Sequence, residues 1–142
     1  MKLHPQAGAE MLSGANHPFL ERAALVALRH HERWDGSGYP GGLLGEECPY
    51  DARIVAVADV YDALGQPRCY KPGWTETEIE KYFVESSGRL FERRIVEALL
   101  DARPRLRQIA KAFPETTIEQ ELTSGVVKVA GGSSPALRLD NA

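Results

Sequence analysis

The sequence has few cysteines and no long hydrophobic run. Its 142 residues include two cysteines, Cys48 and Cys69, which lie in unlike contexts without the close spacing of a thiolate zinc site. This scarcity excludes a disulfide framework and fits a reducing cytoplasm, where we expect the protein to work. No apolar run approaches the ~18 residues of a membrane span, and the first residues show no signal-peptide core. We therefore expect neither export nor membrane anchoring.

The sequence also lacks an excess of basic residues. Lysine and arginine number 17 against 20 aspartates and glutamates, which gives a net charge of −3. This balance argues against a nucleic-acid partner. Hydrophobic residues make up 43% of the chain, which is enough for the core of one globular domain.

Apolar residues recur at helical spacing through most of the first 113 residues, so we predict an all-α fold. Between residues 50 and 64 the local strand propensity is high, but the helical pattern is longer than a typical strand and favours a helix. Beyond about residue 123 the composition shifts to Gly, Ser, Ala and Val, and we predict disorder there, within a C-terminal extension over 114–142. The predicted helices span about 5–14, 18–34, 50–64, 75–86, 90–104 and 106–113.

The segment 35–49 is rich in glycine and proline, which is typical of turns. It also carries Tyr39, Leu43 and Leu44, whose side chains have apolar surface to bury. We therefore predict an ordered loop and not a linker.

Two adjacent histidines, His30 and His31, follow the helix predicted from Pro18. A single buried histidine is usually satisfied by a backbone carbonyl. Neighbours on a helix point about 100° apart, so this pair can reach two points of one cavity, as a two-metal site requires. We expect both imidazoles at the C-terminal end of a mostly buried helix. His17, beside Pro18, is instead expected to cap the helix or lie at the surface.

A third imidazole, from His4, extends the set of candidate ligands. Imidazole and carboxylate donors without thiolate suit iron, manganese or zinc. The carboxylate candidate is Asp59, which interrupts an apolar run and would cost several kcal/mol to bury unless it is paired or bound to metal. Asp62 lies one turn further and can face the same way. The alternative is a solvent-facing helix stripe that includes Asp51 and Val55, and both interpretations stay open.

Two cations, Arg68 and Lys71, lie three residues apart in the loop after this helix. Their side chains can pair with phosphate oxygens. The alternative is that both are ordinary loop cations in water.

Taken together, these residues resemble the HD-GYP family of bacterial cyclic-dinucleotide phosphodiesterases. The stretch from His30 to Pro40 is similar, without a gap, to the family signature HHExxDGxGYP. The segments around Gly45, Asp59 and Arg68 follow in the family's order. The resemblance covers roughly residues 1 to 100.

The resemblance implies an HD-domain-like helical bundle over residues 1–113, with a centre of two or three divalent ions, most often iron or manganese. It implies hydrolysis of cyclic di-GMP to linear pGpG or GMP in bacterial second-messenger signalling. By position in the family's motifs, the implied metal ligands are His4, His30, His31 and Asp59, of which the last three are also the implied catalytic residues. The implied substrate-binding residues are Tyr39, Arg68 and Lys71.

In this family the His-Asp dyad and further ligands lie upstream of the segment that His4 matches. We therefore expect an N-terminally truncated domain, with weak or no hydrolysis by this chain alone. One alternative is a non-catalytic interaction module whose loop around Tyr39 binds signalling partners such as diguanylate cyclase domains. Another is a gene remnant without function. An upstream receiver or sensor domain and a homodimer are further partners that the resemblance implies.

Overall fold

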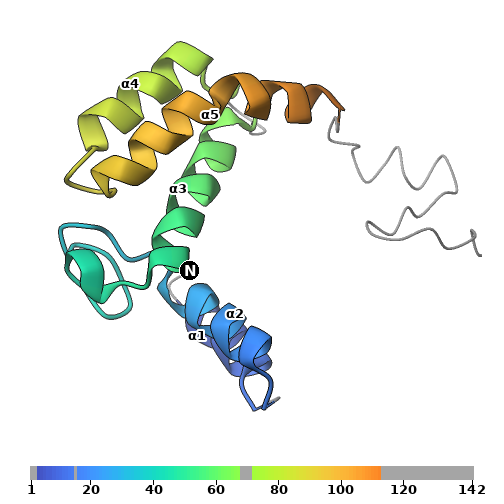
Figure 1. The fold of residues 1–142 in the computed structure, drawn as a ribbon, viewed down its shortest axis with the longest axis vertical. Coiled ribbons are helices and arrows are strands. Elements are labelled where there is room, and N and C mark those ends of the chain that lie inside the picture. Colours follow the sequence, from blue (N-terminus) through green and yellow to red (C-terminus); the bar gives the residue numbers. More distant parts are fainter. Residues whose placement is uncertain (1–2, 15, 68–71, 113–142) are drawn as a thin grey trace, which may run out of the picture. The chain divides into compact units, whose positions relative to one another are not determined.

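The computed structural model describes residues 3–14, 16–67 and 72–112, and these residues are helical, with isolated β-bridges but no named strand (Figure 1). The all-α prediction is confirmed. The chain divides into two units, Met1–Arg103 and Pro104–Ala142. The predicted extension over 114–142 lies outside the described residues, and the predicted domain boundary stays a prediction. The helices are α1 (His4–Leu12), α2 (Pro18–Arg29), η1 (Gly45–Glu47), α3 (Tyr50–Gly65), α4 (Glu76–Ser86) and α5 (Arg93–Ala112).

Helices α1 and α2 both carry proline in the first turn, where its missing N–H costs nothing. His17 is the N-cap of α2, and its Nδ1 accepts a hydrogen bond from the Phe19 N–H at 3.2 Å. The predicted capping role of His17 is confirmed. Helix α1 packs on α2, α2 on α3 and α3 on α4 (Figure 1). None of the described helices is both long and apolar enough to cross a membrane.

Helix α2 is less buried than the sequence predicted. Ala24 is its one buried residue, and the Phe19 side chain is 73% exposed. The expectation of a mostly buried helix is wrong because α1 and α3 contact α2 while Phe19 and Arg22 face solvent.

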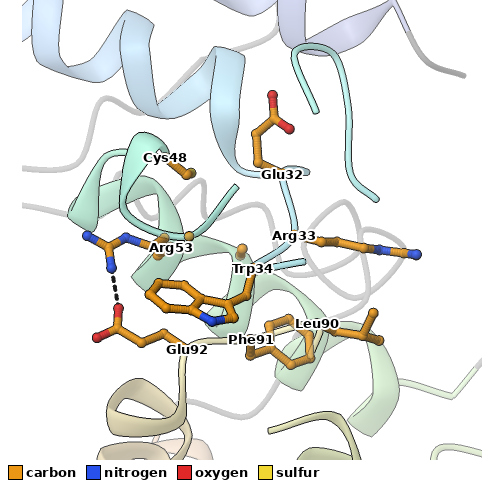
Figure 2. Close-up of a pocket in the computed structure, with 10 residues that line it drawn as sticks. Glu32, Arg33, Trp34, Cys48, Arg53, Leu90, Phe91 and Glu92 are labelled. Carbon is orange, nitrogen blue, oxygen red and sulfur yellow. Dashed lines mark hydrogen bonds and ion pairs between the residues drawn. The ribbon is translucent and has the colours of Figure 1, made fainter. Parts of the chain in front are cut away.

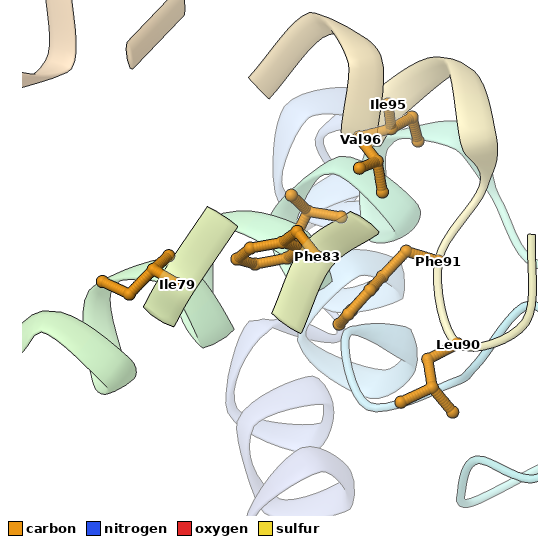
Figure 3. Close-up of a cluster of buried hydrophobic side chains, with 7 residues drawn as sticks. Ile79, Phe83, Leu90, Phe91, Ile95 and Val96 are labelled. Atoms are coloured by element: carbon orange, nitrogen blue, oxygen red, sulfur yellow. The ribbon is translucent and has the colours of Figure 1, made fainter. Parts of the chain in front are cut away.

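The core of the first unit lies between α3, α4 and the first turns of α5. Phe83 of α4 is fully buried, and its ring packs against that of Phe91 at a centroid distance of 5.2 Å and a tilt of 41° (Figure 3). Burying each such side chain contributes about 1.5–3 kcal/mol. The cluster comprises Val57, Ile79, Phe83, Leu90, Phe91, Ile95 and Val96.

Helix α4 begins where the sequence predicted. Thr75 is the N-cap, its Oγ1 accepts from the Glu78 N–H at 3.3 Å, and the Thr75 N–H donates to the Glu78 carboxylate at 2.7 Å. This reciprocal pair satisfies two N–H groups that have no partner inside the helix.

Helix α5 continues through Pro104, where the sequence predicted an end followed by a separate short helix. That prediction is wrong. Proline removes the hydrogen bond to the carbonyl four residues earlier, which is that of Leu100. In the structure the Arg103 Nε donates to the Leu100 carbonyl at 3.1 Å. The side chain thus replaces the bond that Pro104 cannot make, and the helix continues.

Candidate metal site

Three histidines from two helices converge at one end of the α1–α2 pair. His4 is the first residue of α1, His30 is the C-cap of α2, and His31 follows it. One ring nitrogen from each lies within 4.8 Å of the others. The Nε2 atoms of His4 and His31 are 2.9 Å apart. The structure thus brings together residues that are 27 positions apart in the sequence.

A backbone carbonyl fixes the orientation of the His30 ring. Its Nδ1 lies 2.8 Å from the Ala27 carbonyl oxygen. Because a carbonyl oxygen only accepts, Nδ1 is the donor, and in the neutral imidazole this leaves the lone pair on Nε2. A hydrogen bond from the second ring nitrogen to a backbone carbonyl is the usual way in which a metal-binding histidine is oriented.

His31 is packed between aromatic rings. Its ring lies 4.1 Å from that of His30 and 4.8 Å from that of Tyr39, with the Tyr39 ring stacked at 26°. Burial, followed by the charges of His30 and His4, lowers the pKa of His31, and the nearby Asp59 opposes this shift. A lowered pKa keeps the imidazole neutral at neutral pH, which is the form that binds a cation.

Asp59 is exposed on α3, so the expected burial of its carboxylate is wrong and the solvent-facing alternative describes it better. It does not belong to the three-histidine cluster. Asp59 and His30 nevertheless line the same groove, about 490 Å³ in volume, with Phe19 and Val55 on its apolar walls. The carboxylate therefore lies on the same side of the bundle as the imidazoles.

The other acidic residues of the predicted stripe have partners elsewhere. Asp51 is ion-paired with Arg22 of α2, which lowers the pKa of the carboxyl. Asp62 accepts a hydrogen bond from the Gln66 side chain at 2.9 Å. Arg68 and Lys71, the predicted phosphate-binding cations, lie outside the described residues.

The glycine-rich segment that follows His31 is an ordered loop, as predicted, and its base is closed by backbone bonds. The Trp34 N–H donates to the Leu90 carbonyl at 2.9 Å, and the Gly45 N–H donates to the Trp34 carbonyl at 2.8 Å. Asp35 accepts from the N–H and hydroxyl of Ser37 at 2.9 and 2.6 Å, which lowers the pKa of Asp35.

Arg53 of α3 contacts Trp34, in the signature from His30 to Pro40, and Glu92, beside the helical core. Its guanidinium is ion-paired with Glu92 and lies 5.5 Å from the Trp34 ring centroid and 5.2 Å from that of Tyr50 (Figure 2). Arg53, Trp34 and Glu92 line a small cavity. The sequence analysis missed this contact because the partners are far apart in the chain.

Glu32 is the second residue that the sequence analysis missed. It directly follows the two histidines, but its carboxylate is directed into the loop and not toward the three-histidine cluster. Figure 2 shows it pointing away from Arg53 and Glu92. A charged residue among turn-forming glycines was the available signal.

The three imidazoles fit a divalent cation. Two nitrogens bound to one zinc-sized ion are at most ~4.2 Å apart, from bond lengths of about 2.0–2.1 Å. A spread of 4.8 Å exceeds this limit, so the rings would have to rotate toward one another to bind one ion. Three protein donors leave coordination positions open, as in catalytic sites and unlike closed structural ones. Three neutral donors also leave the charge of the cation uncompensated, which the nearby Asp59 would partly offset.

Comparisons with known proteins show which proteins this chain is similar to. A protein-family model described as an HD domain matches residues 1–95. The cyclic di-GMP phosphodiesterase response regulator RpfG of Xanthomonas campestris pv. campestris is 55% identical over 113 residues, which cover 80% of this chain and 30% of that protein. A cyclic di-GMP phosphodiesterase of Thermotoga maritima is 46% identical over 100 residues, which cover 70% of this chain and 27% of that protein.

A third relative is named for a different cyclic dinucleotide. The 3′3′-cGAMP-specific phosphodiesterase 2 of Vibrio cholerae is 40% identical over 115 residues, which cover 81% of this chain and 22% of that protein. This chain thus spans less than a third of the length of each of the three relatives.

Proposed function

This chain belongs to the HD-domain family, in its HD-GYP branch, and we propose that it supplies part of the metal centre of a cyclic di-GMP phosphodiesterase. The observation that carries the proposal is the convergence of His4, His30 and His31, whose ligand nitrogens lie within 4.8 Å of one another. His30 and His31 are half-buried and His4 is exposed. Half-buried imidazoles require hydrogen-bond partners, and stability alone does not explain why three imidazoles gather without a carboxylate between them.

We assign the metal ligands to His4, His30, His31 and Asp59. Membership of this phosphodiesterase family implies dependence on a divalent metal, and we propose two or three ions, iron or manganese, in the intact domain. When bound, such a cation supplies Lewis-acid polarisation of the phosphodiester. The contact between His30 Nδ1 and the Ala27 carbonyl orients this ring. The low pKa of His31 keeps that ring in its unprotonated form.

For substrate binding we propose Tyr39, Arg68 and Lys71. The Tyr39 ring lies against the His31 ring, beside the three-histidine cluster. There it can stack on a base. Two cations in one loop suit the two phosphates of a cyclic dinucleotide. We propose cyclic di-GMP over 3′3′-cGAMP because the relative with 55% identity is named for cyclic di-GMP. Products would be linear pGpG or GMP.

Metal analysis tests the ligand assignment. We expect near-stoichiometric iron or manganese in the full chain purified under anaerobic conditions, and loss of that metal in His31→Ala. His17→Ala is the matched control, since His17 caps α2 outside the cluster, and it should retain the metal. Equal metal content in the His31→Ala and unmodified proteins would refute the assignment.

A hydrolysis assay tests the activity. With metal supplied, we expect weak or no hydrolysis of cyclic di-GMP by this chain, followed by chromatographic detection of pGpG and GMP, and still less hydrolysis of 3′3′-cGAMP. Robust turnover would show that the residues of this chain suffice for the reaction, and it would support the phosphodiesterase assignment. A preference for 3′3′-cGAMP would overturn the proposed substrate.

The second candidate is a non-catalytic interaction module. The observation that favours it is Leu44, a large apolar side chain that is exposed on the glycine-rich loop over residues 35–49. Candidate partners are diguanylate cyclase domains, a receiver or sensor domain, or a second copy of the chain. Capture of a purified diguanylate cyclase domain that survives His31→Ala but not Leu44→Ser would favour the module. A bacterial source and a cytoplasmic location stay predictions.

A further inference from the structure

We propose that Glu32 is a positioning residue for the His31 imidazole. Its carboxylate fixes the middle of the glycine-rich loop over residues 35–49, and that loop holds Tyr39 against the His31 ring. The consequence for metal binding rests on the proposed function, whereas the effect on ring packing does not.

The first observation is that the Glu32 carboxylate is buried and that both of its oxygens have partners. The Glu32 side chain is 0% exposed. Its Oε1 accepts from the Gly41 N–H at 2.6 Å and lies 3.2 Å from the Arg29 guanidinium, while Oε2 accepts from the Leu43 N–H at 3.1 Å. A buried carboxylate requires partners of this kind to remain ionised. Both oxygens are engaged in the loop, so Glu32 is placed to shape the loop and not to bind metal.

The second observation is the close approach of the loop at two glycines, to side-chain ends at Gly41 and to rigid backbone at Gly38. A Cβ on Gly41 would lie 2.4 Å from the Arg29 guanidinium and 2.9 Å from the Glu32 carboxylate. A Cβ on Gly38 would lie 2.4–2.6 Å from the backbone of residues 32–33. The glycines thus let the loop fold back directly over the residues that follow His31.

The third observation connects the loop to the imidazole. Between those two glycines lies Tyr39, whose N–H donates to the His31 carbonyl at 3.2 Å and whose ring stacks on the His31 ring at 4.8 Å. One residue therefore contacts both the backbone and the ring of His31. Glu32 anchors the chain on the C-terminal side of Tyr39, at residues 41 and 43.

The base of the loop is held separately from its middle. Trp34 and Gly45 close it through backbone bonds that do not involve Glu32. Releasing the carboxylate should therefore loosen the segment around Tyr39 without unfolding the domain.

The test compares Glu32→Gln with Glu47→Gln in the full chain. In Glu32→Gln an amide NH₂ replaces one oxygen and faces a backbone N–H donor, and the ion pair with Arg29 is lost. Glu47 is the matched control because its carboxylate accepts from the Leu44 N–H at 2.8 Å in the same loop, whereas the N–H groups of Gly41 and Leu43 donate to Glu32.

Two measurements are made. In the metal-free proteins, NMR follows the nuclear Overhauser contacts between the His31 and Tyr39 rings, which we expect to vanish in Glu32→Gln and persist in Glu47→Gln. Titration with Co²⁺, followed by its visible absorption, should show an affinity about 10–100-fold weaker in Glu32→Gln, as for other residues that orient metal ligands. A merely structural role would lower the unfolding midpoint and leave both readouts of the folded protein unchanged.

Intact ring contacts in folded Glu32→Gln would overturn the inference. If the unmodified chain binds no Co²⁺, the proposed metal site fails, but the ring contacts still decide the role of Glu32. Gly41→Ala guards against a misfolded variant, because its Cβ would force the ends of the Arg29 and Glu32 side chains to shift while Glu32 remains. It should reproduce the loss of ring contacts, and their persistence in a folded Gly41→Ala protein would likewise overturn the inference.

Discussion

Replacing Arg53 with methionine should lower the free energy of unfolding by about 4 kcal/mol. The side chains of Arg53 and Glu92 are 14% and 10% exposed. Removing one partner of a buried ion pair leaves an uncompensated charge and costs about 3–5 kcal/mol. The remaining exposure places this pair near the lower end, about 3 kcal/mol. Loss of the cation–π contacts with Trp34 and Tyr50 adds about 1 kcal/mol.

The same reasoning predicts the outcome of a double-mutant cycle. In Arg53→Met/Glu92→Met both charges are absent, and a well-packed apolar pair in place of a buried ion pair is often neutral or stabilising. The double variant should therefore be more stable than Arg53→Met alone, by about 2–3 kcal/mol. Urea unfolding followed by circular dichroism measures all four proteins.

An exposed ion pair of the same domain is the matched control. Lys81 and Glu85 are 3.9 Å apart on α4, and their side chains are 75% and 65% exposed. Lys81→Met should change stability by about 0–1 kcal/mol. Two results would refute this reasoning: Arg53→Met costs no more stability than Lys81→Met, or the double variant is less stable than both single variants. In either case the Arg53–Glu92 ion pair does not stabilise the fold as predicted.

Three further predictions follow from the loop and the core. Gly38→Ala should destabilise the protein by about 3 kcal/mol in urea unfolding, because its Cβ meets the rigid backbone of residues 32–33 at 2.4–2.6 Å. Asp35→Ala should be destabilising at neutral pH, because hydrogen bonds from Ser37 depress the pKa of the native carboxyl below its ordinary value of 3.8. That contribution is complete above this value and is lost as the pH falls through the lower native pKa, so the stabilities of the two proteins should converge in acid denaturation below that pKa. Phe83→Ala should cost about 3–5 kcal/mol in thermal unfolding, because the ring is fully buried.

Each of these predictions has a contradicting outcome. A Gly38→Ala protein as stable as the unmodified chain would show that the loop does not fold back as described. A stability gap between the unmodified and Asp35→Ala proteins that stays constant as the pH falls below that native pKa would exclude the carboxylate as its source. A loss below about 1 kcal/mol in Phe83→Ala would mean that the ring is not enclosed by the cluster.

Local patterns predicted the helices well, because their signals lie within a few residues of each other. The pair of Thr75 and Glu78 gave the start of α4, and His17 with Pro18 gave the start of α2. Pro104 misled the prediction because the compensating donor, Arg103, is a side chain whose geometry the sequence does not display.

Burial was predicted less well than helicity. The apolar run around Asp59 suggested a buried carboxylate, but the residue is exposed at the groove. Similarly, the apolar face of α2 suggested a buried helix, but Phe19 is exposed. Periodicity shows which residues share a face of a helix, whereas the partner that covers this face is a property of the tertiary structure.

The sequence by itself determined the family, through the uninterrupted signature from His30 to Pro40, and it identified the three histidines as candidate ligands. Only the tertiary structure brought His4 to within 2.9 Å of His31, turned the Glu32 carboxylate into the loop and paired Arg53 with Glu92. The physical reason is that spacing along a chain fixes local backbone geometry, whereas contacts between residues 27 or 39 positions apart depend on how whole helices pack.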